Sequence, residues 1–437
     1  MTLRLRAADA LPLVAAAAIP LVFLHVRYQA HAAFGSVDIY GSDVAIVVVL
    51  AAGAAAGVKF GWEPLRRGRW LWLVSALFVG LMFASCFWRP LGDLTTHLTT
   101  VAKYAEYALL APAVALLFRR PVDLDRFLWV FVVWAAAAGL WGGLMFLGVV
   151  DDPDGPRPGQ REVSFLGHQL LGSFTGAAVA IGFAAIALGT HRRLAAVAVV
   201  GGGLGVIVDA SVFAFLGTLL AAVAVVLVTW RLRTLSLARL LAVCAILVVV
   251  GSGVSVLRGS DVTNYLGFLG VTEPNKATTG HVETGQQRTL LLWMGWQMWK
   301  DHPVLGLGID RSNTGFQPYL AALKRRFPGQ PAEAYPSKQN PWGVQNYWLE
   351  LASDMGIAGF VLGVSAFLIG LVLAFGAVRV NPFFALVATG FILVAAGTWN
   401  ALGIVSGVPL DALTWIGLGL GTTAIPVAAA YRGTARV

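Results

Sequence analysis

Apolar runs of about 20 residues recur along almost the whole chain and alternate with short polar connections. A helix needs about 20 apolar residues to cross the hydrocarbon core of a membrane. The pattern therefore predicts about twelve membrane-spanning helices, at residues 9–26, 43–60, 70–88, 101–118, 127–150, 168–189, 194–208, 212–230, 240–257, 351–378, 383–403 and 409–430. The pair 194–208 and 212–230 is the least regular, because its first member is short and rich in glycine.

One long segment, residues 258–350, breaks this alternation. Loops of this length are usually functional or disordered. We therefore expect three regions: a membrane region of about nine helices over 1–257, a large loop with active-site elements over 258–350, and about three further helices over 351–437.

The long loop contains a helical stretch from Thr289 to Lys300 that carries three tryptophans, Trp293, Trp296 and Trp299. Their spacing puts the three rings on roughly one helix face. Tryptophan anchors helices at the membrane interface, but aromatic rings also stack on the apolar faces of sugars. The two interpretations are compatible, and the sequence leaves both open.

The composition excludes most other classes of protein. Of the 437 residues, 58% are hydrophobic and only 12% are charged, whereas average usage is about 25% charged. Such a chain is too apolar for a water-soluble globule or a disordered segment. The predicted fold class is an all-α integral membrane protein, because helices satisfy their own backbone hydrogen bonds in lipid.

Basic residues concentrate in alternate connections, which sets the expected orientation. The connections on the side of the N-terminus hold Arg4, Arg6, Lys59, Arg66, Arg67, Arg69, Arg119, Arg120, Arg126, Arg192, Arg193, Arg231, Arg233, Arg239, Arg379, Arg432 and Arg436. We expect both termini in the cytoplasm and the large loop on the opposite side of the membrane. The net charge of +9 then reflects topology rather than nucleic-acid binding.

The chain offers few groups for metal or nucleotide chemistry. Its seven histidines have no metal-ligand spacing, and there is no HExxH motif, EF-hand loop or phosphate-binding loop. Cys86 and Cys244 both lie inside apolar runs. We therefore expect no metal and no cofactor.

Polar residues do gather on the outer side: Arg157, Arg161, His168, Asp209, Ser211, Arg288, Gln345, Asn346 and Glu350. An arginine suits a diphosphate, because its planar fork donates two parallel hydrogen bonds and keeps its charge. The alternative for Arg157 and Arg161 is contact with lipid headgroups.

The long loop resembles the O-antigen ligase and O-antigen polymerase superfamily. Arg288 is followed by the tryptophan-bearing helix and by the stretch from Asp301 through His302 to Gly308; then come Gln345-Asn346-Tyr347-Trp348-Leu349-Glu350 and Gly356-Ile357-Ala358-Gly359. Members of the superfamily share an arginine, an "hPllGvG" stretch and "HN.yLel…GxxG", in this order. The segment from Arg161 to Leu171 resembles a further family segment more loosely.

The resemblance implies a metal-independent, inverting glycosyl transfer from a glycan on undecaprenyl diphosphate, carried out at the large loop on the periplasmic side of a bacterial inner membrane. In the ligases two arginines hold the diphosphate, and a histidine is the candidate for activating the acceptor hydroxyl. Arg288 matches one arginine. Ser211-Val212-Phe213-Ala214 stands where the second is usual, and Gln345 takes the place of the histidine.

These departures change the expected chemistry. Glutamine cannot act as a general base, although it can orient a hydroxyl. Arg157 or Arg161 could supply the second positive charge, and Glu350 or Asp209 could take the proton. The catalytic candidates are Arg288, Gln345 and Glu350, and the substrate-binding candidates are Arg157, Arg161, His168, Asn346, Trp293 and His302.

The departures favour a polymerase of exopolysaccharide, capsule or O-antigen repeat units. A ligase that transfers a finished glycan to lipid A-core or another acceptor is the main alternative. A transporter of the lipid-linked sugar and a non-catalytic scaffold are weaker ones. The expected partners are the undecaprenyl-diphosphate-linked oligosaccharide and membrane lipids, with a flippase and a chain-length regulator of the same pathway to be considered, and no nucleic acid.

Overall fold

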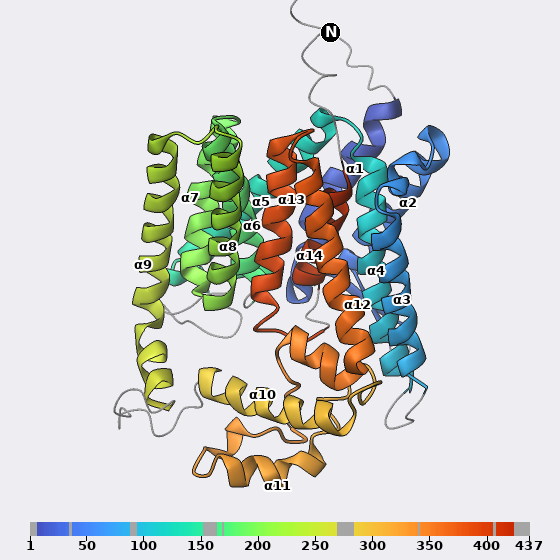
Figure 1. The fold of residues 1–437 in the computed structure, drawn as a ribbon, viewed down its shortest axis with the longest axis vertical. Coiled ribbons are helices and arrows are strands. Elements are labelled where there is room, and N and C mark those ends of the chain that lie inside the picture. Colours follow the sequence, from blue (N-terminus) through green and yellow to red (C-terminus); the bar gives the residue numbers. More distant parts are fainter. Residues whose placement is uncertain are drawn as a thin grey trace, which may run out of the picture.

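The chain folds into a bundle of helices with a smaller helical region across one end (Figure 1). The computed structural model describes residues 7–34, 37–87, 94–151, 164–167, 170–268, 284–339, 341–404 and 408–423. The α-helices are α1 Ala7–Val22, α2 Gly41–Phe60, α3 Arg69–Ser85, α4 Leu94–Leu117, α5 Pro121–Phe146, α6 Leu170–Leu188, α7 Arg192–Asp209, α8 Val212–Arg231, α9 Leu237–Phe268, α10 Thr284–Asp301, α11 Gln317–Arg326, α12 Tyr347–Ala377, α13 Pro382–Thr398 and α14 Val408–Thr422.

Every predicted span has a helix at its place, namely α1 to α9 and α12 to α14. Seven helices within the described residues are long and apolar enough to cross a membrane: α2, α4, α5, α6, α8, α9 and α12. Parts of α1, α3 and α13 are apolar but shorter. The prediction of an all-α membrane protein is confirmed.

Helix α6 forms the centre of the bundle, and α9 lies at its edge (Figure 1). In α6, 94% of the most apolar window is buried, against 17% in α9. A helix that is apolar all round can be buried on all sides, and the small residues of α6 let its neighbours approach closely. The side chains of α9 instead present an apolar surface suited to lipid.

The glycines of α7 have a packing role. A β-carbon on Gly201 would come within 2.5 Å of the Cα of Ala136 in α5, and one on Gly205 within 2.5 Å of Thr175 in α6. The glycines that weakened the predicted span therefore let α7 pack closely against both neighbours. The turn to α8 is short because Ala210 adopts a left-handed conformation (φ 49°) and Ser211 caps α8.

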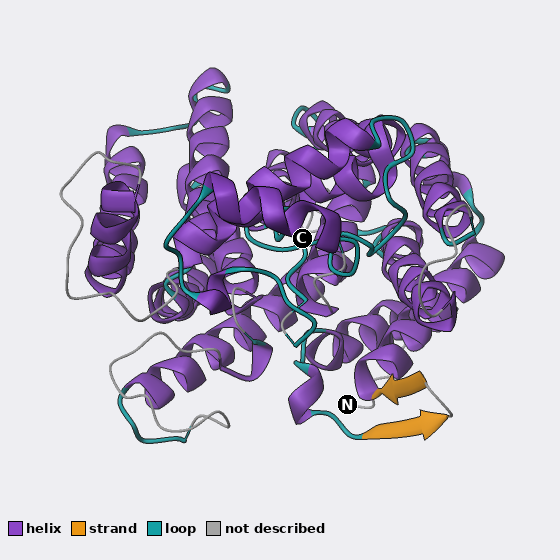
Figure 2. Cartoon of the chain, turned by 90° about the horizontal axis from the view of Figure 1, so that it is seen from below, coloured by secondary structure: helices purple, strands orange, loops and turns teal. Residues whose placement is uncertain are grey.

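Helices α10 and α11 lie across the end of the bundle opposite to the start of α1 (Figures 1 and 2). We call this end the outer end and the opposite one the inner end. The two helices share a small apolar core made of Leu290, Leu291, Met294, Met298, Leu307, Phe316, Leu323, Ala334 and Tyr335. The 3₁₀ turn Ala332–Ala334 contributes to it.

Two local features differ from the sequence prediction. Helix α9 continues to Phe268, past the predicted boundary at residue 257. A two-stranded antiparallel hairpin, β1 (His31–Phe34) and β2 (Val37–Tyr40), pairs His31 with Tyr40; it lies at the rim of the molecule in Figure 2. Strands this short leave no periodic pattern to detect. The expected position of the C-terminus lies outside the described residues.

Candidate active site

The stretch from Pro303 to Gly308 pairs with a break in helix α12. The backbone N–H of Leu307 donates to the Ser353 carbonyl (2.9 Å), and that of Gly308 donates to the Asp354 carbonyl (2.7 Å). The N–H of Ile357 donates in turn to the Pro303 carbonyl (2.8 Å). The loop thus supplies partners that a broken helix would otherwise lack.

Glycine is required on both sides of this pairing. Gly356 has φ 64° and ψ −165° inside α12, a region open essentially to glycine alone. A β-carbon there would lie 2.1 Å from the Val304 carbonyl oxygen, and one on Gly306 (φ 65°) would lie 2.2 Å from the Asp354 carbonyl carbon. The two glycine motifs of the long loop are therefore two sides of one contact.

A buried polar cluster lies beside this contact. The Asp354 carboxylate accepts from the backbone N–H of Arg311 (3.2 Å), and Glu350 accepts from the N–H of Ile404 (3.2 Å). The Ser312 hydroxyl lies 3.4 Å from both carboxylates and donates to one at a time. Glu350 is only 6% exposed and Asp354 is fully buried. The cluster thus ties the outer loop to α12 and to the connection before α14.

Asp310 adjoins the same cluster, and its charge acts on both carboxylates. Its carboxylate accepts from the Asn313 side chain (2.7 Å), and burial raises its pKa to about 6. Within the described residues, no group of three or more His, Cys, Asp and Glu side chains is placed to hold a metal ion.

Gln345 and Asn346 immediately precede α12 and differ in their contacts. Asn346 caps the helix by accepting from the Leu349 N–H (3.0 Å) and donates to the Asn400 carbonyl (3.3 Å). Gln345 adopts a left-handed backbone (φ 51°), and its half-buried side chain has no hydrogen bond to the described part of the chain. Asn346 is held by the fold, whereas the Gln345 amide is available to a ligand.

Arg288, near the start of α10, lies against the outer end of α8. Its guanidinium is 5.7 Å from the centre of the Phe213 ring. Phe213 belongs to the segment in which the family pattern has its second arginine. Arg288 therefore brings a positive charge to a helix end that lacks one of its own.

Helices α8 and α13 pack closely between Arg288 and Asn346, so the two residues are linked through a series of neighbouring contacts. A β-carbon on Gly397 would come within 2.9 Å of the Phe213 carbonyl oxygen. The Gly397 carbonyl accepts from the Asn400 side chain (3.1 Å), and Asn400 accepts from Asn346. Arg288 and the pair Gln345–Asn346 thus flank the same two helix ends, at the boundary between the bundle and the outer helices.

The remaining candidates occupy different surroundings. Trp293 is partly buried and lies edge-on to Phe327 (6.2 Å), whereas Trp296 is 47% exposed and lies 4.8 Å from the Trp299 ring. The most accessible of the three rings is therefore that of Trp296. His302 immediately follows α10, next to the stretch that pairs with α12, and is half-buried.

Three candidates, Arg157, Arg161 and His168, lie outside the described residues. Asp209 is fully buried at the end of α7, where a β-carbon on Gly172 of α6 would come within 2.3 Å of its carboxylate oxygen. It therefore lies inside the bundle, between two helix ends.

Sequence reasoning missed Asp310, Ser312 and Asp354. One signal was present: Glu350 and Asp354 are four residues apart in an apolar helix, so they share a face. Acidic residues in such a helix are rare and need a partner. The partner segment, 310–312, carries no motif of its own and could not have been assigned without the structure.

Comparison with known proteins agrees with this geometry. The family model described as O-antigen ligase matches residues 197–364, from α7 past the break in α12. None of the curated proteins matches the chain. The match spans Arg288, the paired glycine motifs and Gln345–Asn346, and it supports membership of this membrane protein in the O-antigen ligase and polymerase superfamily.

Proposed function

We propose that this protein polymerises oligosaccharide repeat units carried on undecaprenyl diphosphate, for an exopolysaccharide, capsule or O-antigen, at the periplasmic face of the inner membrane. The observation that carries the proposal is the placement of Arg288 and Gln345 around the outer ends of α8 and α13. A lipid-linked donor approaches from the bilayer, so its diphosphate would lie at this boundary.

In this proposal Arg288 neutralises the diphosphate and thereby makes it a good leaving group. The acceptor hydroxyl attacks the anomeric carbon from the opposite face. The new C–O bond forms as the bond to the diphosphate breaks, the hydroxyl proton passes to the released diphosphate or to water, and the configuration inverts. Electrostatic stabilisation of a leaving group is often the largest contribution to catalysis, so no metal and no strong base are required.

Gln345 would orient the acceptor hydroxyl, because its amide is free to hydrogen-bond. Asn346 would fix the position of Gln345 by capping α12. Arg157, Arg161 and His168 remain proposed contacts of the diphosphate or glycan, and His302 and Trp293 proposed neighbours of the glycan. Glu350 would hold the outer loop and the connection before α14 in place and would not transfer a proton, since both of its oxygens have donors within the fold.

A ligase is the second candidate function. The family model is described as O-antigen ligase, and the same donor chemistry serves both reactions. The amide at Gln345 favours the polymerase, because the resemblance places a histidine there in the ligases. A flippase and a chain-length regulator are proposed functional partners of the polymerase.

The test uses purified protein in nanodiscs with an undecaprenyl-diphosphate-linked oligosaccharide repeat as the only sugar substrate. A ladder of products on a gel supports the polymerase. No ladder, but transfer once a lipid A-core acceptor is added, supports the ligase. Arg288→Ala should abolish either product, whereas Lys300→Ala, which removes an exposed cation from the same helix, should leave it intact.

A further inference from the structure

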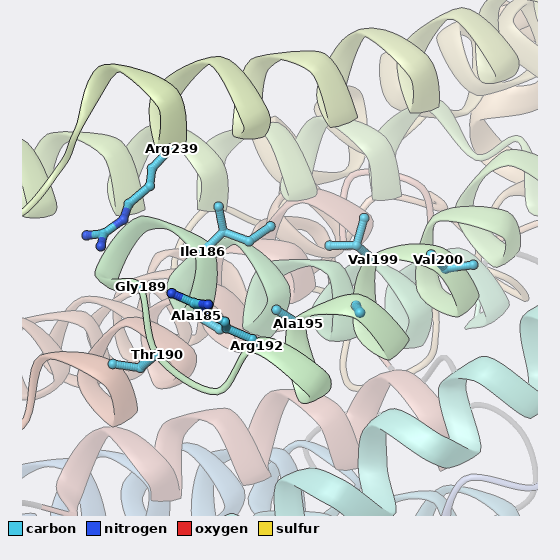
Figure 3. Close-up of a pocket in the computed structure, with 10 residues that line it drawn as sticks. Ala185, Ile186, Gly189, Thr190, Arg192, Ala195, Val199, Val200 and Arg239 are labelled. Carbon is cyan, nitrogen blue, oxygen red and sulfur yellow. The ribbon is translucent and has the colours of Figure 1, made fainter.

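A separate pocket opens at the inner end of the bundle, far from the candidate active site. It has a volume of about 400 Å³ and lies between α6, α7 and α9 (Figure 3). Ten residues line it: Ala185, Ile186, Gly189, Thr190, Arg192, Ala195, Ala196, Val199, Val200 and Arg239. None of them takes part in the proposed glycosyl transfer, and the inference below does not depend on that function.

Two arginines from different helices stand at this pocket. Arg239, at the start of α9, extends its guanidinium over the turn that follows α6: a β-carbon on Gly189 would lie 2.3 Å from the Arg239 Nη2. The same guanidinium is fixed by donating to the Thr234 carbonyl (3.0 Å). Arg192, at the start of α7, is exposed, and its side chain has no hydrogen bond to the described part of the chain.

No acidic side chain is among the lining residues. Asp125 forms an ion pair with His191 (3.2 Å), which precedes α7, and neither residue lines the pocket. The pocket therefore combines two positive charges with no counter-charge of its own. It suits an anion.

The body of the pocket is apolar and continues toward the outside of the bundle. Ile186 and Val199 line it, and Val200, one residue further along α7, is 73% exposed. An occupant with a charged head at the arginines and a hydrocarbon chain along α7 would match both parts.

We propose that this pocket binds an anionic diacyl phospholipid of the inner leaflet, with its phosphate between Arg192 and Arg239 and one acyl chain along Val199 and Val200. Basic pockets between membrane helices bind anionic headgroups in this way. The volume accommodates a headgroup and the first part of a chain. A soluble anion would use the two charges but leave the apolar extension unfilled.

The experiment counts bound lipids by native mass spectrometry of the delipidated full chain, titrated with phosphatidylglycerol or phosphatidylcholine. One phosphatidylglycerol should bind with clear preference. Each basic residue near a charged lipid surface contributes about 1 kcal/mol, so Arg192→Gln should weaken this binding about five-fold. Ala196→Trp should weaken it as well, because the indole fills the apolar part without changing the charge.

Arg193→Gln is the matched control, since Arg193 is an exposed neighbour that does not line the pocket. An equal loss of phosphatidylglycerol binding with Arg193→Gln would show that the lipid is attracted by the basic surface in general and not by this pocket, and it would overturn the proposal. Equal binding of phosphatidylcholine would also overturn it, and so would full competition by millimolar inorganic phosphate, which would indicate a soluble anion. Thermal unfolding of each variant checks that the fold is kept.

Discussion

Two arginines that bind helix carbonyls at the inner end of the bundle differ from Arg288 at the outer end in what they contact. At the inner end, Arg119 donates to the carbonyls of Phe60 and Leu116, and Arg67 donates to the Leu373 carbonyl. At the outer end, Arg288 places its guanidinium on the ring of Phe213, at the boundary between the bundle and α10.

Arg67 and Arg119 therefore stabilise the fold, whereas we propose that Arg288 takes part in the reaction. The last carbonyls of a helix lack intrahelical partners, and basic side chains near them satisfy these oxygens and the helix dipole. Burial lowers the pKa of both Arg67 and Arg119, which is the cost of placing them inside the fold. Arg288 instead contacts the Phe213 ring at the outer end, where we propose that it meets the substrate diphosphate.

The largest expected effect comes from replacing Arg288 and Arg119, each in turn, by alanine. Arg288→Ala should lower product formation about 100-fold to 1,000-fold, the scale seen when a group that stabilises developing charge is removed, with little change in Tm. Arg119→Ala should lower Tm and leave turnover per folded molecule unchanged. Product assays and thermal melts on both variants measure this. If Arg288→Ala lost Tm and Arg119→Ala lost turnover, the distinction between the two ends would fail.

The break in α12 gives the next effect. Gly356→Ala should destabilise the outer end by about 3 kcal/mol or more, because the backbone conformation strains any β-carbon and the methyl group meets the Val304 carbonyl. Hydrogen exchange of α10 and the start of α12 should report it. Gly80→Ala, in α3 with open space around the glycine, is the control and should be neutral or slightly stabilising.

Asp310 makes the outer end sensitive to pH. Burial raises its pKa from 3.8 to about 6, so between these values the folded chain keeps a proton that the unfolded chain releases. The free energy of unfolding should therefore fall as pH rises through this window, by about 3 kcal/mol at most, and stay level above it.

Asp310→Asn should remove this contribution and raise Tm at pH 7. Thermal melts of wild type and variant from pH 4 to 8 measure it together with the effect of the Asp310 charge on Glu350 and Asp354. Equal slopes for the two proteins would show that Asp310 ionises as freely in the fold as in the unfolded chain.

The smallest effect is expected at Glu350. Glu350→Gln keeps an acceptor for one of the two donors, Ser312 and Ile404, so turnover should fall by less than about ten-fold and its pH profile should keep its shape. A loss comparable to that of Arg288→Ala, with Tm unchanged, would instead make Glu350 the group that takes the acceptor proton.

Sequence reasoning located the membrane helices well, because a span needs a fixed length of apolar residues. It also placed Arg288, Gln345 and the glycine motifs in one region, since the order of motifs in the long loop is specific. It could not show that the Pro303–Gly308 stretch pairs with the break at Gly356, because backbone pairing between distant segments leaves no trace in residue type.

Other features were beyond the sequence for related reasons. The cluster of Asp310, Ser312 and Glu350 depends on a loop whose residues look ordinary in isolation. The approach of Arg239 to Gly189 depends on how α9 packs against the turn after α6. Composition and periodicity describe elements one at a time, whereas these sites arise where two elements meet.

The pairing at the broken helix also fixes the number of residues between the start of α12 and its break. Nine residues separate Asn346 from Gly356, about two and a half helical turns. Inserting or deleting one residue between them would rotate everything beyond by about 100°, so the helix cap and the glycine could no longer both reach their partners. The length of this segment is therefore set by the contacts at its two ends.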